Sequence, residues 1–230
     1  MNNELIPSFK KSLFDTTIDI GVDLLELPID LLTENEIIKD IPIVGTIVKL
    51  GKATTTIRDR HLIKKLVKFI ESINNGDIES EKLERHKQIL ESDNKKLNEE
   101  LENIIIIIDR QLEIDKTKIL GELYKSYVCG NIDWEDFKSF SDVLERLFLI
   151  DIHQFKKIYE NEFIGEKDSF YPISMSRLGS LGLVNYFSGM IVSTKISDED
   201  KKIKGSITEY GRAFYEEGLK KLISSGEFNF

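Results

Sequence analysis

The chain has 230 residues, and its 41 acidic side chains outnumber its 32 basic ones, for a formal net charge of −9. This charge excludes a protein-wide attraction to nucleic acid or to an anionic membrane, so contact with either needs a local basic patch. Hydrophobic residues make up 40% and charged residues 32% of the sequence, as in globular proteins and unlike disordered chains. Only four prolines interrupt a sequence rich in Leu, Ile, Lys and Glu, which favours helices.

Cysteine usage and the N-terminal sequence suit a cytoplasmic protein. The single cysteine, Cys129, excludes an internal disulfide and suits a reducing compartment. Because no histidine lies near it in sequence, we expect a buried inert thiol rather than a nucleophile. The first residues lack the apolar core and cleavage site of a signal peptide. No apolar run reaches the roughly 20 residues of a membrane-spanning helix.

Residues 12–32 are predicted to form a helix with one narrow acidic stripe and an otherwise apolar circumference. The stripe consists of Asp15, Asp19, Asp23, Glu26 and Asp30. Three interpretations stay open: a solvated face, a face that pairs with a basic helix of this chain or of a second copy, and a cation site. A cation site fits least well, because a metal needs converging ligands and a straight stripe spreads them along an axis.

The stretch from residue 40 to residue 72 is predicted to begin with an apolar turn at residues 41–45 and to end in a strongly two-faced helix. The basic half of this helix consists of Arg58, Arg60, Lys64, Lys65 and Lys68. Such a face is typical of a solvated surface or of a contact with a partner protein, nucleic acid or membrane surface. Neighbouring acidic segments screen attraction to phosphate and lipid. We expect this face, the acidic stripe and the apolar segment Ile41–Leu50 to be the interaction surfaces.

The middle of the chain is predicted to be a series of helices joined by short turns. Asp93 and Asp133 are expected to cap two of these helices, and Gly130 to end the helix between them. The run Ile104–Ile108 has the β propensity of a strand. Because the sequence on both sides of it is helical, we interpret this run as a buried helical turn.

The sequence changes character after residue 165. A short helix at Ser174–Leu181, closed by Gly182, precedes two β-favouring runs at residues 183–192 and 203–207, which a charged turn separates. Thr208 is expected to open a final amphipathic helix. A helix followed by a hairpin makes up the second half of a winged-helix unit.

The strings RLGSLGLV at Arg177–Val184 and ITEYGRAFYE at Ile207–Glu216 resemble the closing part of winged-helix domains. They are similar in particular to the C-terminal part of bacterial abortive-infection alpha-type proteins, a family linked to phage defence. The resemblance implies a winged-helix-like fold for this part and a role in defence. It implies no catalytic residues, because the biochemistry of the family is unknown.

DNA contact by this part would have to use basic residues of the predicted helix and wing. These are Arg177, Lys201, Lys202 and Lys204. A recognition helix needs several polar or basic side chains that reach base edges and phosphates, but this helix offers only Arg177. Acids lie among the wing lysines, so nucleic acid is the alternative partner and protein the preferred one.

No pattern of catalytic or metal-binding residues stands out. His61, His86 and His153 lie far apart in sequence, and none forms a metal-binding pair. The nucleophile elbow, the paired-cysteine motif and the glycine-rich dinucleotide loop are all missing. We therefore expect no enzymatic activity, no cofactor and no metal.

The sequence thus predicts a mostly α-helical protein, with a multi-helix domain over residues 1–165 and a small winged-helix-like α+β domain over residues 166–230. Its expected function is that of a non-enzymatic bacterial phage-defence or prophage-associated protein, which acts through contacts with another protein or with itself. One alternative is a winged-helix DNA-binding transcriptional regulator. A second is a membrane-acting effector that inserts the amphipathic helices of residues 12–70.

Overall fold

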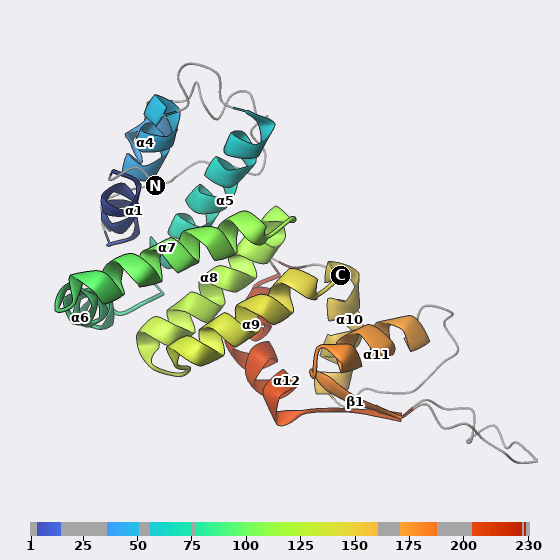
Figure 1. The fold of residues 1–230 in the computed structure, drawn as a ribbon. Helices are drawn as coiled ribbons and strands as arrows, with labels where there is room; N and C mark the ends of the chain where they lie inside the picture. The colour runs from blue at the N-terminus through green and yellow to red at the C-terminus, as the bar shows by residue number, and fades with distance from the viewer. Residues whose placement is uncertain are drawn as a thin grey trace, which may run out of the picture. The chain divides into compact units, whose positions relative to one another are not determined.

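The computed structural model describes residues 4–14, 36–50, 56–74, 77–160, 171–187, 204–226 and 228. These residues are mostly helical, and their two strands pair as one antiparallel sheet (Figure 1). The mostly α-helical class expected from composition and periodicity is therefore confirmed.

The chain divides into two compact units, Met1–Ser141 and Asp142–Phe230. The division falls within helix α9 (Trp134–Arg146), earlier than the boundary at residue 165 suggested by sequence. The reason is helix α10 (Ile152–Tyr159), which packs against helix α11 (Tyr171–Ser180) and strand β2 (Lys204–Ile207). Its buried Phe155 belongs to the core of the second unit, which a polar stretch near residue 165 could not reveal.

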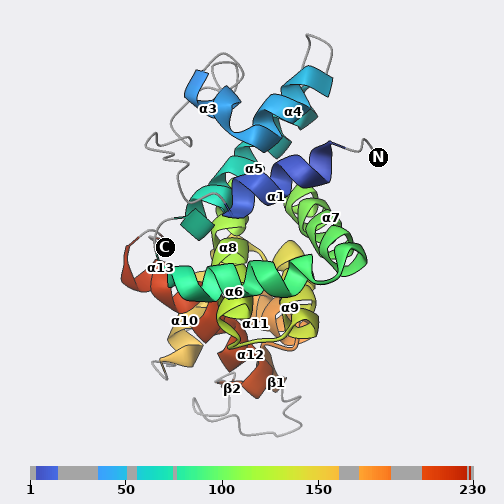
Figure 2. The ribbon, with the colours of Figure 1, turned by 90° about the vertical axis from the view of Figure 1, so that its left-hand side faces the viewer.

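The first unit begins with α1 (Leu5–Phe14), α3 (Glu36–Asp40) and α4 (Pro42–Leu50). The apolar turn expected at residues 41–45 is wrong, because α4 starts at Pro42, whose fixed φ suits the first helical position. Helix α1 packs against α4 and against the longer helix α5 (Ile57–Asn74), as Figure 2 shows. The buried hydroxyl of Ser12 on α1 accepts a hydrogen bond from the Ile43 amide at 3.0 Å. It thereby satisfies a backbone donor that the start of α4 leaves unpaired.

Helix α5 lies inside the first unit, covered by α8 (Ile114–Cys129), α7 (Asn94–Arg110), α1 and α4. Its closest neighbour is α8, where Gly121 faces Ser72 of α5. A Cβ at Gly121 would lie 1.9 Å from the Ser72 hydroxyl oxygen, so only glycine allows this approach. Helix α6 (Ser80–Glu91) packs against α7 and α8.

The helix boundaries predicted in the middle of the chain are confirmed. The Asp93 carboxylate caps α7 by accepting hydrogen bonds from two backbone amides, and Asp133 caps α9 by accepting one from the Asp136 amide at 2.8 Å. Gly130 ends α8 with a φ of 79°, which favours glycine. The run Ile104–Ile108 is helical and buried except for Ile106, which is 44% exposed.

The second unit continues with the short helix η1 (Leu149–Asp151), α10, α11 (Tyr171–Ser180), and strands β1 (Val184–Phe187) and β2 (Lys204–Ile207). The strands are antiparallel, with Val184 opposite Ile207. Helix α12 (Glu209–Phe214), the π-helical turn η2 (Tyr215–Leu219) and α13 (Lys220–Ser224) follow. The predicted cap of α12 is confirmed, since the Thr208 hydroxyl accepts a hydrogen bond from the Gly211 amide at 2.8 Å.

Candidate functional site

The basic half of α5 is not a continuous exposed face, which corrects the expectation from its helical wheel. Lys64 and Lys65 are 7% and 5% exposed, because several helices cover α5 and not one alone. Burial lowers the pKa of both lysines. The Lys65 ammonium donates hydrogen bonds to the backbone carbonyls of Asp109 at 2.6 Å and Gln111 at 2.9 Å. Lys65 therefore caps the C-terminus of α7, where carbonyls lack helical partners.

The exposed part of the predicted basic face lies at the start of α5. Arg60 and Lys68 are half-buried, and Lys68 is paired with Glu71 of its own helix at 2.7 Å. The Arg58 side chain is 80% exposed and forms an ion pair with Asp109 of α7 at 2.5 Å. The structure thus separates Arg58, which faces solvent, from the two buried lysines.

Around Arg58, the start of α5 and the end of α7 border a cavity of about 490 Å³, which we name the α5–α7 hollow. Its lining includes Ile57, Arg58, His61, Asp109, Arg110 and Leu112. Ile57 is 75% exposed and Leu112 is 85% exposed. Large aliphatic side chains in water, beside arginines, are typical of a protein contact surface. The one carboxylate among the described residues of this lining, that of Asp109, is already paired with Arg58.

Several predicted site residues lie outside the described residues. These are Asp15, Asp19, Asp23, Glu26 and Asp30 of the acidic stripe, and Lys201 and Lys202 of the wing. Lys204 is the first residue of β2. The predicted roles of these residues stay predictions.

Arg177, expected to be available for DNA, is engaged within its own unit. Its guanidinium binds both carboxylate oxygens of Asp151, with 2.6 Å from Nε to Oδ2. The Asp151 side chain is 1% exposed, and the Ser174 hydroxyl donates to it at 2.7 Å. These interactions raise the pKa of Arg177, mainly through its hydrogen bond with Asp151. To reach a base, the guanidinium would have to leave a buried carboxylate unpaired, which is costly.

Sequence reasoning missed a buried polar cluster in the first unit. Glu100 of α7, 3% exposed, accepts a hydrogen bond from the Tyr127 hydroxyl at 2.9 Å and from the Tyr124 hydroxyl at 3.4 Å. The His86 imidazole of α6 lies 3.3 Å from the same carboxylate. Burial, followed by the charge of Glu100, raises the pKa of both phenols, so they stay protonated donors at neutral pH. The cluster joins α6, α7 and α8 through satisfied hydrogen bonds.

A cavity of about 590 Å³ adjoins this cluster and brings Cys129 to the same lining as His86 and Tyr127. His86 is distant from Cys129 in sequence, and the two residues meet only through the packing of α6 against α8. The thiol is half-buried. Among the described residues, no group of His, Cys, Asp and Glu is arranged to hold a metal ion.

Comparison with protein-family models, with curated proteins and with solved structures gives no match for this chain. Within the described part of the chain, no helix combines the length and the apolar character needed to cross a membrane.

Proposed function

We propose that this protein acts through protein–protein contacts and that the α5–α7 hollow binds a partner segment with apolar and acidic side chains. The observation that carries the proposal is the exposure of Ile57 and Leu112, at 75% and 85%, beside arginines. Covering a side chain of this size contributes about 2 kcal/mol. Two such side chains in one hollow therefore supply a sizeable part of a specific interface.

The charges of the α5–α7 hollow define the chemistry of the partner. Among the described residues of its lining, Arg58 and Arg110 stand against one carboxylate, that of Asp109, so the hollow is locally basic on a protein with a net charge of −9. A carboxylate of the partner would gain most at Arg58, because its guanidinium is the most exposed of the predicted basic residues on α5. The preferred occupant is an acidic, amphipathic helix of another protein.

The biological setting that we propose is phage defence or competition between prophages. It is supported by the resemblance of residues 177–184 and 207–216 to the abortive-infection alpha-type proteins. We also propose a winged-helix-like arrangement for this part. The order of α11, β1 and β2, a helix followed by two antiparallel strands, supports it.

The test is phage infection of bacteria that express the chain. Wild-type protein should reduce plaque formation relative to an empty vector, and Ile57→Asp combined with Leu112→Asp should abolish the reduction. The matched control is Ile150→Asp, which alters an aliphatic side chain that is 72% exposed in the other unit, and it should protect like wild type. Equal protection by both variants would contradict the assignment of the hollow. No protection by wild type against any phage tested would contradict the defence role.

Two further measurements separate this proposal from the alternatives. Gel shifts at low and moderate salt should show no salt-sensitive duplex binding; binding that Lys201→Ala, Lys202→Ala and Lys204→Ala weaken would favour the DNA-binding regulator. Flotation with vesicles that contain anionic lipid should leave the protein unbound, and co-flotation would favour the membrane-acting effector.

A further inference from the structure

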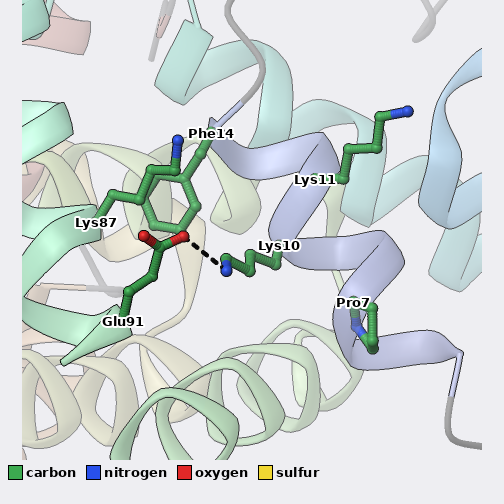
Figure 3. Close-up of a pocket in the computed structure, with 6 residues that line it drawn as sticks. All are labelled: Pro7, Lys10, Lys11, Phe14, Lys87 and Glu91. Carbon is green, nitrogen blue, oxygen red and sulfur yellow. Dashed lines mark ion pairs between the residues drawn. The ribbon is translucent and has the colours of Figure 1, made fainter. Parts of the chain in front are cut away.

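A second cavity of the first unit, about 580 Å³ in volume, lies between α1 and α6 (Figure 3). Helix α1 contributes Pro7, Lys10, Lys11 and Phe14, and α6 contributes Lys87 and Glu91. The α1 residues follow one another at spacings that place them on a single face of the helix, and Lys87 and Glu91 are one turn apart on α6. This cavity, which we name the α1–α6 groove, therefore has two helix faces as its walls.

The groove carries more positive than negative charge. Among the described residues that line it, the only carboxylate is Glu91, which is paired with Lys10 at 2.7 Å. The hydrogen bond from Lys10 lowers the pKa of Glu91, so this carboxylate is ionised at neutral pH. Glu91 thereby balances the charge of Lys10, and the positive charge of Lys87 remains in the groove. The Lys87 ammonium is 3.5 Å from Glu84, an exposed and weak pair. The Lys11 side chain points away from Lys87 and Glu91 (Figure 3).

An aromatic ring stands beside these charges. Figure 3 shows the Phe14 ring next to the Lys87 ammonium, with the Glu91 carboxylate at the same end of the groove. Phe14 is half-buried, and its ring centroid lies 6.4 Å from that of His86. The neighbouring Phe9 and Leu13 of α1 are fully buried, so Phe14 is the aromatic side chain of α1 that a ligand can reach.

We propose that the α1–α6 groove binds a nucleoside phosphate. The ammonium groups of Lys10 and Lys87, which Figure 3 shows on the same side as the Phe14 ring, supply the charge that a phosphate needs. The Phe14 ring offers a surface on which a base can stack. The volume suits a ligand of this size, because small-molecule sites span roughly 300 to 1,000 Å³. This site is separate from the α5–α7 hollow and does not depend on the proposed function.

Glu91 makes the proposal specific. A bound phosphate competes with this carboxylate for Lys10, so Glu91 weakens binding of the anion. Glu91→Gln removes the competing charge and leaves a side chain of the same size. It should therefore raise the affinity for the ligand, whereas loss of Lys87 should lower it.

The test is calorimetric titration of the full chain with adenosine 5′-monophosphate, inorganic phosphate and adenosine at low salt. The monophosphate should bind most tightly. Lys87→Gln should weaken it about tenfold, and Glu91→Gln should strengthen it by a similar factor. Phe14→Leu should weaken binding of the monophosphate while leaving that of inorganic phosphate unchanged. The matched control is Lys96→Gln, an exposed lysine of α7 whose loss changes the net charge equally, and it should have no effect.

Three results would overturn the proposal. The first is the absence of saturable binding of the monophosphate. The second is equal affinity for the monophosphate and inorganic phosphate, which would exclude recognition of the base. The third is an equal effect of Lys87→Gln and Lys96→Gln, which would show that only the net charge matters. Circular dichroism of each variant verifies that the helices are retained.

Discussion

The start and the middle of α5 carry the same kinds of side chain in opposite environments. At the start, Ile57 and Arg58 face solvent. In the middle, Lys64 and Lys65 are buried, and Lys65 holds the end of α7 through two backbone carbonyls. Basic residues of one helix therefore divide into a group that stabilises the fold and a group available for contact. Burial and hydrogen-bond partners decide which group a residue belongs to, and charge alone does not.

The second unit contains an internal basic residue of the same kind. Arg177 donates hydrogen bonds to the buried carboxylate of Asp151, as Lys65 donates hydrogen bonds to the carbonyls at the end of α7. Removing an internal polar partner should lower the free energy of unfolding and leave partner binding unchanged. Removing an exposed residue of the hollow should weaken partner binding and leave the free energy of unfolding nearly unchanged. The following predictions test this division, beginning with the largest effect on stability.

Arg177→Ala should lower the free energy of unfolding by about 3 kcal/mol, because it leaves the carboxylate of Asp151 buried without its partner. Urea unfolding measures the loss. Adding Asp151→Asn should recover part of it, since the buried group is then neutral. The control is Arg212→Ala, an exposed arginine whose guanidinium lies 5.5 Å from the centroid of the Tyr159 ring, with an expected cost of about 0.5 kcal/mol. Similar losses for both alanine variants would contradict an internal role for Arg177.

Lys65→Met should lower the free energy of unfolding by about 1.5 kcal/mol. Methionine retains the aliphatic stem, but the carbonyls of Asp109 and Gln111 lose the donor that satisfies them. Arg58→Met provides the comparison within the same helix, and breaking its exposed ion pair should destabilise the protein less than Lys65→Met does, because solvent screens the pair. The division of α5 would be wrong if Arg58→Met proved the more destabilising change in the same urea titration.

Tyr127→Phe should cost about 1 kcal/mol at neutral pH, because Glu100 loses its shortest hydrogen bond. The pKa of Tyr127 is raised in the folded protein, first by burial and then by Glu100. The stability that this phenol contributes is therefore fully present below its unfolded pKa of about 10 and is lost as the pH rises further. The free energy of unfolding, measured from pH 9 upward, should decline less steeply with pH in the variant than in wild type. An identical decline would show that Tyr127 does not titrate with folding.

Local interactions explain which parts of the fold could be predicted from the sequence. The caps at Asp93, Asp133 and Thr208 depend on hydrogen bonds within a few residues, and the left-handed end of α8 requires only Gly130. The helical turn at Ile104–Ile108 was set by its neighbours in sequence. These features can be predicted from the sequence because they depend on residues close to them in the chain.

Tertiary packing explains what the sequence could not supply. A helical wheel assumes one covered side, so it assigned Lys64 and Lys65 to the surface, whereas α5 is covered by four helices. Leu112 lies between α7 and α8 and is 85% exposed. The cluster around Glu100 joins residues of three helices, and no local pattern marks them as neighbours.

The most direct test of the central claim is site-specific photo-crosslinking in phage-infected cells. A photoreactive benzoylphenylalanine replaces Leu112 in one version of the chain and Ile150 in another, because both side chains are highly exposed. We predict a discrete protein adduct from position 112 that Arg58→Glu removes, and no such adduct from position 150. The same adducts from both positions, or an adduct from position 112 that Arg58→Glu leaves unchanged, would contradict a basic, apolar contact surface at the start of α5.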